Sequence, residues 1–201
     1  MSRLTRLTIA YAAAAALVPT VARAHEAGDI AGGFFAGFMH PLGGPDHIVA
    51  MVAVGLWGGQ LGRPAIWALP IVFPMVMAFG GALGAREVPV PFIEAGISIS
   101  AIVLGAMVAF AARPALWIAG VIVGFFAIFH GYAHGAELPE AATPLAYGAG
   151  FVIATGMLHL TGVAVGLVWR WPVGKRVVRT CGVLVAAVGI YFLIAQIAGG
   201  N

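Results

Sequence analysis

The sequence has little charge and a single cysteine. Lysine, arginine, aspartate and glutamate make up 8% of the 201 residues, while 62% of the residues are hydrophobic. Soluble domains carry about 25% charged residues, so this composition excludes an ordinary soluble protein. The one cysteine, Cys181, excludes an internal disulfide and a thiolate-rich metal or redox site. Any metal site in this chain must therefore use nitrogen and oxygen donors.

The sequence also lacks a basic patch and a nucleotide-binding loop. Its formal net charge is +3, but the basic residues lie scattered between apolar runs, which argues against nucleic acid as a partner. No G-x-x-x-x-G-K-[ST] motif occurs, so a phosphate-binding loop of that type is not available to couple the protein to ATP. The lipid bilayer is the partner that the composition predicts.

Long apolar segments dominate the chain. A helix needs about 20 apolar residues to cross a bilayer, and glycine, proline or charge separates successive apolar segments. We predict an all-α polytopic membrane protein with six transmembrane helices in a single domain over residues 25–201. The predicted segments are residues 30–59, 64–85, 90–112, 114–136, 144–169 and 177–198. Small residues spaced four apart predict close helix packing at Gly55 and Gly59, Gly120 and Gly124, and Gly162 and Gly166.

The N-terminus has the pattern of a secretory signal peptide. Arg3 and Arg6 precede an apolar stretch over residues 7–21, and the sequence ARA at 22–24 supplies the small residues of a cleavage site. We predict that residues 1–24 are removed, which makes His25 the first residue of the mature chain; an uncleaved first helix is the alternative. In both cases His25 lies on the exported side of the membrane.

The basic residues between the predicted helices orient the chain. With His25 outside, the outer loops contain only Arg86. The inner loops contain six basic residues, namely Arg63, Arg113, Arg170, Lys175, Arg176 and Arg179. This asymmetry follows the positive-inside rule and agrees with the orientation that the signal sequence requires.

The sequence HPLGGPDH at residues 40–47 interrupts the first predicted helix. Two prolines and two glycines break the helical hydrogen bonds at membrane depth, where non-helical backbone persists only beside protein or a water-filled cavity. The same stretch contains His40, Asp46 and His47. Because broken helices with ionisable side chains are typical of transport sites, we predict that these three residues bind a transported ion.

Other predicted helices carry ionisable residues as well. His130 and His134 are four residues apart on one face of the fourth helix, where two imidazoles can share one ion. Glu137 follows close behind them, Glu94 lies near the start of the third helix, and His159 lies within the fifth. Each has a structural alternative. The histidine pair could be a solvated helix end, Glu94 a protonated acid bonded to a neighbouring helix, and His159 a tether to a backbone carbonyl.

Apart from Arg179 at the inner end of the last segment, the predicted helices contain no lysine or arginine that could neutralise their carboxylates. An ionised carboxylate at the bilayer centre costs about 2.5–3.5 kcal/mol, so Asp46 and Glu94 each require a proton, a histidinium or an exogenous cation. Imidazole and carboxylate ligands suit nickel, cobalt, zinc or manganese, and the lack of thiolates argues against copper(I). His25 and Asp29 are candidates for a first chelating station, with ordinary surface residues as the alternative.

The predicted topology divides these candidate ligands by depth into a funnel that faces the exported side. The outer part is expected to contain Asp29, Glu94, His130, His134 and Glu137. The deeper part is expected to contain His40, Asp46, His47 and His159.

Four motifs give the chain a resemblance to a known family. They are HPLGGPDH at 40–47, FIEAGISIS at 92–100, FHGYAHGAE at 129–137 and HLTG at 159–162. In this order they resemble the motifs of the HupE/UreJ family of nickel and cobalt permeases, and the first motif is the most specific. The larger nickel/cobalt transporter family has one residue fewer between the first histidine and the aspartate of this motif, so the smaller family is the better match.

The resemblance implies an importer of nickel or cobalt in the bacterial inner membrane, with a periplasmic N-terminus and no enzymatic activity. The metal ion is then the cargo, and no prosthetic group is expected. A second copy of the chain and the metallochaperones of hydrogenase or urease maturation are further candidate partners. The residues that fall on motif positions are His40, Asp46, His47, Glu94, His130, His134 and Glu137.

Two other classes of protein use similar residues. A membrane-embedded metalloenzyme would require an open ligand position and a substrate pocket. A haem or redox protein would place histidine pairs on facing helices, and the purified protein would absorb visible light.

Overall fold

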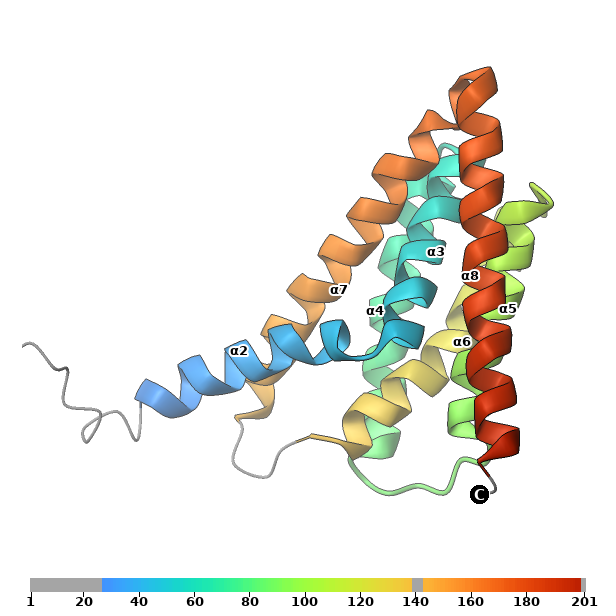
Figure 1. Ribbon diagram of the computed structural model, residues 1–201. Helices are drawn as coiled ribbons and strands as arrows, with labels where there is room; N and C mark the ends of the chain where they lie inside the picture. The colour runs from blue at the N-terminus through green and yellow to red at the C-terminus, as the bar shows by residue number, and fades with distance from the viewer. Residues whose placement is uncertain (1–26, 139–142, 200–201) are drawn as a thin grey trace, which may run out of the picture.

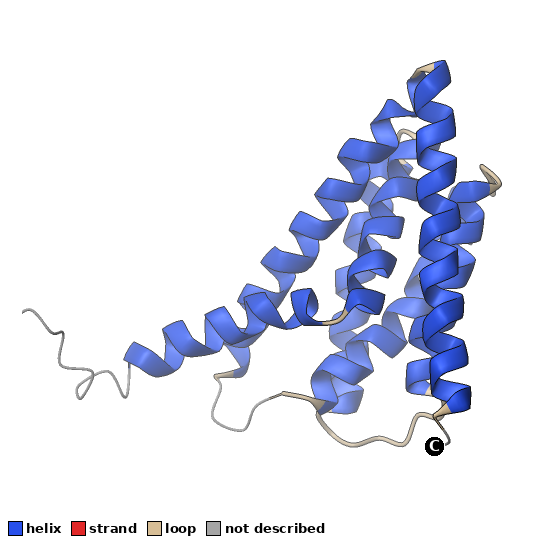
Figure 2. Cartoon of the chain, viewed as in Figure 1, coloured by secondary structure: helices blue, strands red, loops and turns tan. Residues whose placement is uncertain are grey.

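The computed structural model describes residues 27–138 and 143–199, and within these ranges it contains helices and no strand (Figures 1 and 2). The predicted signal peptide and His25 lie outside the described residues. The helices are α2 (Ala27–Gly43), α3 (Pro45–Leu61), α4 (Ala65–Gly84), α5 (Ile93–Ala109), α6 (Leu116–Ala136), α7 (Pro144–Gly166) and α8 (Pro172–Ala198), and a 3-10 turn at Leu167–Arg170 extends α7. The predicted all-α class is confirmed for this part of the chain.

Four helices, α4, α6, α7 and α8, are long and apolar enough to cross a membrane, and α5 is a shorter apolar helix. Large apolar side chains stay exposed on the outer faces of α4 and α8, including Met75 at 70% and Ile194 at 59%. In water such faces would favour aggregation, whereas in a bilayer they contact lipid tails at no cost. The chain is therefore a multi-pass helical membrane protein.

The first predicted segment forms two helices, and the break lies inside HPLGGPDH as predicted. Gly44 is the single non-helical residue between α2 and α3, with φ −104° and ψ 110°. Pro45 occupies the first turn of α3, where its missing N–H would have no helical partner. In Figure 1, α2 lies at a steep incline to the other helices and meets α3 part-way along the bundle. Each of these helices has 17 residues, fewer than the roughly 20 that a full crossing needs.

Helix α3 is the centre of the fold. It contacts α4, α5, α7 and α8. Its side chains Met51, Val54 and Trp57 are fully buried, with no exposed surface. The inner face of the bundle therefore converges on α3, and the residues that begin this helix are held on a packed support.

Glycines allow α3 and α7 to cross closely. A Cβ atom at Gly55 would collide with the carbonyl oxygen of His159, and one at Gly162 would collide with that of Val52. The predicted close packing of these helices is confirmed. The close packing predicted for Gly120 and Gly124 is wrong. A Cβ at Gly120 would meet nothing within 4 Å, and one at Gly124 would meet only side chains at 3.6 Å.

Helices α4 and α6 also cross closely, but through other glycines of α6. A Cβ at Gly131 would collide with the carbonyl oxygen of Met77, and one at Gly135 with that of Gly81. This crossing supports the segment of α6 that carries His130 and His134.

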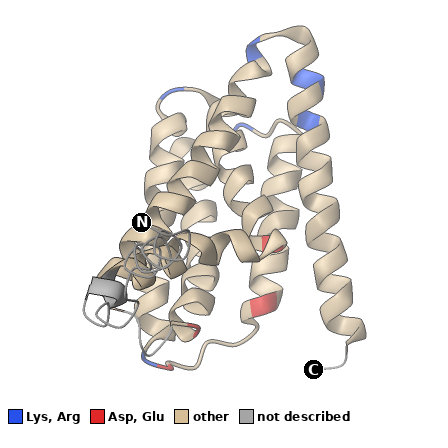
Figure 3. Ribbon diagram, turned by 60° about the vertical axis from the view of Figure 1, so that its left-hand side comes forward, with Lys and Arg blue, Asp and Glu red and all other residues tan. Residues whose placement is uncertain are grey.

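Charged residues separate along the bundle. Figure 3 shows most Lys and Arg residues at one end of the molecule. The links α3–α4, α5–α6 and α7–α8 meet at this end, which we name the basic end. These links carry Arg63, Arg113 and Arg170, and Lys175 lies near the start of α8. Arg86 lies in the α4–α5 link at the opposite end.

Hydrogen bonds at the basic end join α3 to the end of α5 and to the α5–α6 link. The Trp57 Nε1–H donates to the carbonyl oxygen of Ala112 at 3.0 Å, and the Gln60 amide donates to that of Val108 at 3.0 Å. Arg113 donates in return to the backbone carbonyl of Gln60 at 3.2 Å. The last turns of the two helices are thus tied together.

Candidate metal centre

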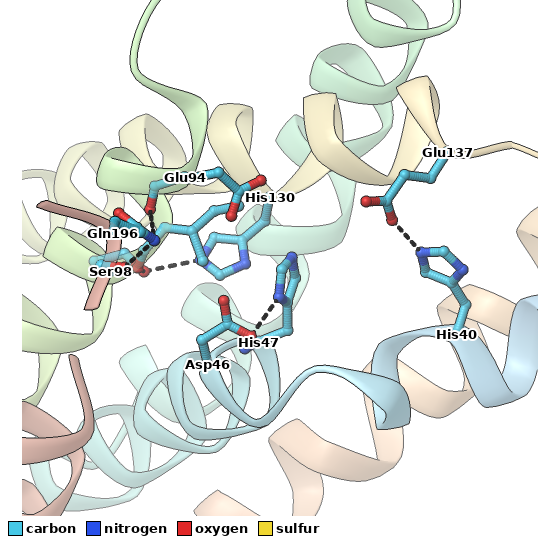
Figure 4. A network of polar contacts seen from close by, with 10 residues as sticks. His40, Asp46, His47, Glu94, Ser98, His130, Glu137 and Gln196 are labelled. Atoms are coloured by element: carbon cyan, nitrogen blue, oxygen red, sulfur yellow. Dashed lines mark hydrogen bonds and ion pairs between the residues drawn. The ribbon is translucent and has the colours of Figure 1, made fainter. Parts of the chain in front are cut away.

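A cavity of about 480 Å³ lies at the break between α2 and α3 and opens away from the basic end. Its polar lining comes from the break itself and from the end of α6, namely His40, Asp46, His47, His134 and Glu137. Figure 4 shows side chains from these elements converging on one space. The helix break therefore forms a polar cavity inside an otherwise apolar bundle.

His40 and Glu137 meet at the mouth of this cavity. The distance between His40 Nε2 and Glu137 Oε2 is 3.0 Å (Figure 4), although the residues are 97 positions apart. One ligand atom from each of His40, His134 and Glu137 lies within 4.8 Å of the others. Ligands on one transition-metal ion lie roughly 3–4 Å apart, as metal–ligand bonds of about 2.0–2.2 Å require. Small side-chain movements would therefore bring these three residues onto one ion.

His47 is oriented by its neighbour Asp46. Its Nδ1 lies 3.0 Å from Asp46 Oδ1, and its backbone N–H donates to the same oxygen at 2.9 Å. An ionised carboxylate only accepts, so Nδ1 carries the proton and Nε2 keeps the lone pair. This Nε2 is buried and has no partner among the described residues. Carboxylates orient metal-binding histidines in the same way.

His130 is oriented by Ser100. The Ser100 hydroxyl donates its one hydrogen to the carbonyl oxygen of Ile97 at 2.6 Å, so its oxygen must accept from His130 Nε2, 2.8 Å away. The Nδ1 lone pair of His130 is then free, and this atom is buried without a partner. The His130 ring lies 5.0 Å from the His47 ring, centroid to centroid. Two free ring nitrogens thus belong to neighbouring imidazoles.

His134 connects these groups. Its ring centroid lies 4.8 Å from that of His40 and 4.5 Å from that of His47. It is 7% exposed, and neither of its ring nitrogens has a partner among the described residues. A buried polar atom without a partner costs about 1–3 kcal/mol. We name His40, His47, His130 and His134 the outer cluster.

Glu94 does not line the cavity at the helix break. It is exposed in the first turn of α5 and lines a separate cavity together with Gln196. Figure 4 shows its carboxylate on the same side of the site as His130 and His47. Its backbone carbonyl accepts a hydrogen bond from Gln196 of α8 at 3.2 Å, which ties the start of α5 to the end of the chain.

His159 lies apart from the outer cluster, on α7. Its Nδ1–H donates to the carbonyl oxygen of Met51 on α3 at 2.8 Å, so the tether considered for this residue is present. Its Nε2 is buried and unpartnered. The Phe73 ring lies close to both His159 and His130, with centroid distances of 5.2 Å and 5.5 Å.

The predicted division of the ligands by depth is wrong. His40 lies at the mouth beside Glu137, and His130 is fully buried. The prediction assumed a straight first helix, whereas the incline of α2 brings the break level with the end of α6. The alternative of a solvated helix end for His130 and His134 is also wrong, because both are buried. Asp29 lies in α2, and the structure does not describe its side chain.

Sequence reasoning missed Ser100 and Phe73. Ser100 belongs to the FIEAGISIS motif, and a serine in an apolar helix was the available signal. Phe73 carries no such signal, because phenylalanine is an ordinary residue in an apolar helix.

The comparisons with known proteins agree with the motifs. The family model described as HupE / UreJ protein matches residues 13–192. Protein HupE of Rhizobium leguminosarum bv. viciae is 41% identical over 181 residues, which cover 90% of this chain and 94% of that protein. No solved structure matches the chain. With its motifs, its helix break and these matches, the chain belongs to the HupE/UreJ family.

Proposed function

We propose that this protein imports a divalent transition-metal ion, nickel with cobalt as the alternative cargo, across the bacterial inner membrane. Membership of the HupE/UreJ family supports nickel and cobalt as the cargo. The ligand atoms are imidazole nitrogens and carboxylate oxygens, which suit these ions and are equally compatible with zinc or manganese.

The observation that carries this proposal is the set of free ring nitrogens at the helix break. His47 and His130 each have one ring nitrogen hydrogen-bonded and the other buried without a partner, and His134 has both free. Purely structural histidines bury few such atoms, because each costs free energy. A cation that these nitrogens coordinate would recover that cost.

The proposed orientation has six spans, with α2 and α3 forming the first, and a periplasmic N-terminus. The basic loops then face the cytoplasm, as the positive-inside rule expects. The cavity at the outer cluster would open to the periplasm, and the α3–α5 hydrogen bonds would close the cytoplasmic end. The structure would then represent an outward-open state.

The membrane potential is one energy source open to this proposed import. An inside-negative potential contributes about 2.3 kcal/mol per elementary charge for each 100 mV, and a divalent ion gains twice that amount on entry. Proton exchange at the histidines and capture of the metal inside the cell are the other sources open to a chain without a nucleotide-binding loop.

Uptake of radiolabelled nickel and cobalt by cells that express the chain tests the proposal. His40→Ala, Asp46→Ala and His47→Ala should each lower uptake by at least about tenfold, as loss of a metal ligand or its orienting carboxylate does. Gly156→Ala is the control, since Gly156 does not line the cavity and a Cβ there would meet nothing within 4 Å. Absence of uptake by the unmodified protein, or unchanged uptake in all three variants, would contradict the proposal. Haem absorbance of the purified protein would point to electron transfer instead.

A further inference from the structure

We propose that His159 and Thr155 of α7 form a second metal station, deeper than the outer cluster and next to the Phe73 ring. The choice of ligand, a divalent transition-metal ion that binds imidazole, rests on the proposed function. The position of the station rests on the burial and hydrogen bonding of His159 and Thr155.

A role as a tether does not account for the buried Nε2 atom of His159. The hydrogen bond from Nδ1–H to the Met51 carbonyl fixes the ring and joins α7 to α3. That bond leaves a lone pair on Nε2, and this atom is buried without a partner in a residue only 1% exposed. The tether needs only the Nδ1–H donor, and Nε2 takes no part in it. The orientation is the one that a metal ligand with a backbone carbonyl behind it adopts.

Thr155 supplies a second unpartnered atom beside His159. It lies four residues earlier, on the same face of α7, and is fully buried. Its Oγ1 has no hydrogen-bond partner among the described residues. Because helical side chains lean toward the N-terminus of their helix, the His159 ring extends over the turn that carries Thr155. The imidazole nitrogen and the hydroxyl therefore lie in the same buried region.

One face of α7 links this region to the outer cluster. Tyr147 and Phe151 precede Thr155 and His159 at successive intervals of four residues, and all four are buried. The Tyr147 ring lies 5.7 Å from that of His40, and the Phe151 ring 4.4 Å from that of His134, between centroids. The face that lines the outer cluster thus continues inward to His159.

Phe73 is the ring next to His159. The centroid of its buried ring lies 5.2 Å from that of His159 and 5.5 Å from that of His130. The histidine rings of the outer cluster lie within 5.0 Å of one another in pairs, whereas no histidine ring of the described residues pairs with His159 in this way. An ion at His159 would therefore occupy a separate station.

The second station has fewer and weaker ligands than the outer cluster. It offers one imidazole and one hydroxyl, and neither free atom has a carboxylate partner among the described residues. Water and backbone carbonyls would complete the coordination. Such a site binds more weakly than the outer cluster, as an ion on its way out of a transport path requires.

The decisive variant is His159→Asn. The Asn amide can still donate to the Met51 carbonyl, as His159 Nδ1–H does, but it has no nitrogen in place of Nε2. Thr155→Val removes the hydroxyl while keeping the shape of the side chain. Thr161→Val is the matched control on α7, because Thr161 is exposed and its hydroxyl bonds only the Met157 carbonyl at 2.9 Å.

Titration of the purified full chain in detergent with Co²⁺, followed by absorption spectroscopy and equilibrium dialysis, measures the two stations. The unmodified protein and Thr161→Val should bind one equivalent tightly and a second at least tenfold more weakly. His159→Asn should lose the second equivalent, Thr155→Val should weaken it, and both should keep the first within twofold. The proposal is overturned if the unmodified protein binds no second equivalent, or if His159→Asn retains it.

Uptake of nickel into liposomes containing the purified protein separates this inference from the proposed function. His159→Asn should lower uptake at least tenfold although the outer cluster still binds metal. Uptake equal to that of the unmodified protein would show that the second station is not on the transport path and would overturn the inference. If the unmodified protein binds two equivalents but transports none, the proposed function fails and the second station stands.

Discussion

At the scale of single residues, three histidines are held in defined tautomers by three different acceptors. His47 donates to a carboxylate, His130 to a serine hydroxyl and His159 to a backbone carbonyl. In each ring the remaining nitrogen is buried and unpartnered. The acceptors are thus as important to the candidate site as the histidines, because they determine which nitrogen of each ring stays free for a ligand.

Ser100 provides a direct test of this orientation. Ser100→Ala removes the acceptor of His130 Nε2–H, so the ring loses its preferred tautomer and the outer cluster should bind Co²⁺ about 10–100-fold more weakly. The affinity is measured by the absorption of bound Co²⁺ in detergent. Ser98→Ala is the matched control, since Ser98 is also fully buried on α5 but accepts from Gln196 at 3.0 Å. Equal effects of the two alanine variants would argue against a role for Ser100 in orienting His130. Ser100→Thr keeps the hydroxyl and should bind Co²⁺ as the unmodified protein does.

At the scale of helices, the site depends on two departures from regular packing. The single extended residue Gly44 ends α2 and allows α3 to start in a new direction. A Cβ at Gly44 would lie 2.9 Å from both Asp46 Oδ1 and His47 Nδ1, so only glycine leaves room for this pair. The second departure is the close crossing of α3 and α7, which brings His159 against the Met51 carbonyl.

Gly162→Ala tests the importance of that crossing. The added methyl would collide with the backbone oxygen of Val52, which cannot move without shifting α3. Overpacking of this kind costs about 1–3 kcal/mol, so the melting temperature in detergent should fall by several degrees. Gly156→Ala on the same helix should leave it unchanged or raise it, because its Cβ would meet nothing within 4 Å. Equal melting temperatures for the two variants would mean that the helices separate at little cost.

At the scale of the whole molecule, the two ends of the bundle differ in charge and in closure. The basic end is tied by hydrogen bonds between α3 and α5, while the opposite end contains the cavity and its carboxylates. A cation approaching from the end with the cavity meets Glu137, which is 61% exposed, before it reaches the buried histidines. The arrangement favours entry of cations from that end.

The orientation in the membrane is tested by cysteine labelling. The chain has one cysteine, so Cys181→Ser gives a background without thiols. In this background Val88→Cys, in the α4–α5 link, should react with a membrane-impermeant maleimide added outside the inner membrane. Val173→Cys, at the basic end, should react only after the membrane is permeabilised. Both positions are exposed, and neither substitution alters a charge. The reverse pattern would invert the proposed direction of transport.

Several features of this protein follow from the sequence alone. Composition identified a helical membrane protein, because an apolar chain of this length has no soluble fold available to it. The break at HPLGGPDH was predictable because proline and glycine act on the backbone locally. The types of ligand were predictable for a similar reason, since ionisable residues are costly in apolar helices wherever those helices pack.

The tertiary structure alone decided how these residues combine. The incline of α2 brings His40 to Glu137, and the packing of α5 on α6 brings Ser100 to His130. The α3–α7 crossing orients His159, and α4 places Phe73 beside both His130 and His159. Angles between helices arise from the fit of whole surfaces, often around glycines far apart in the chain, so no local pattern in the sequence encodes them.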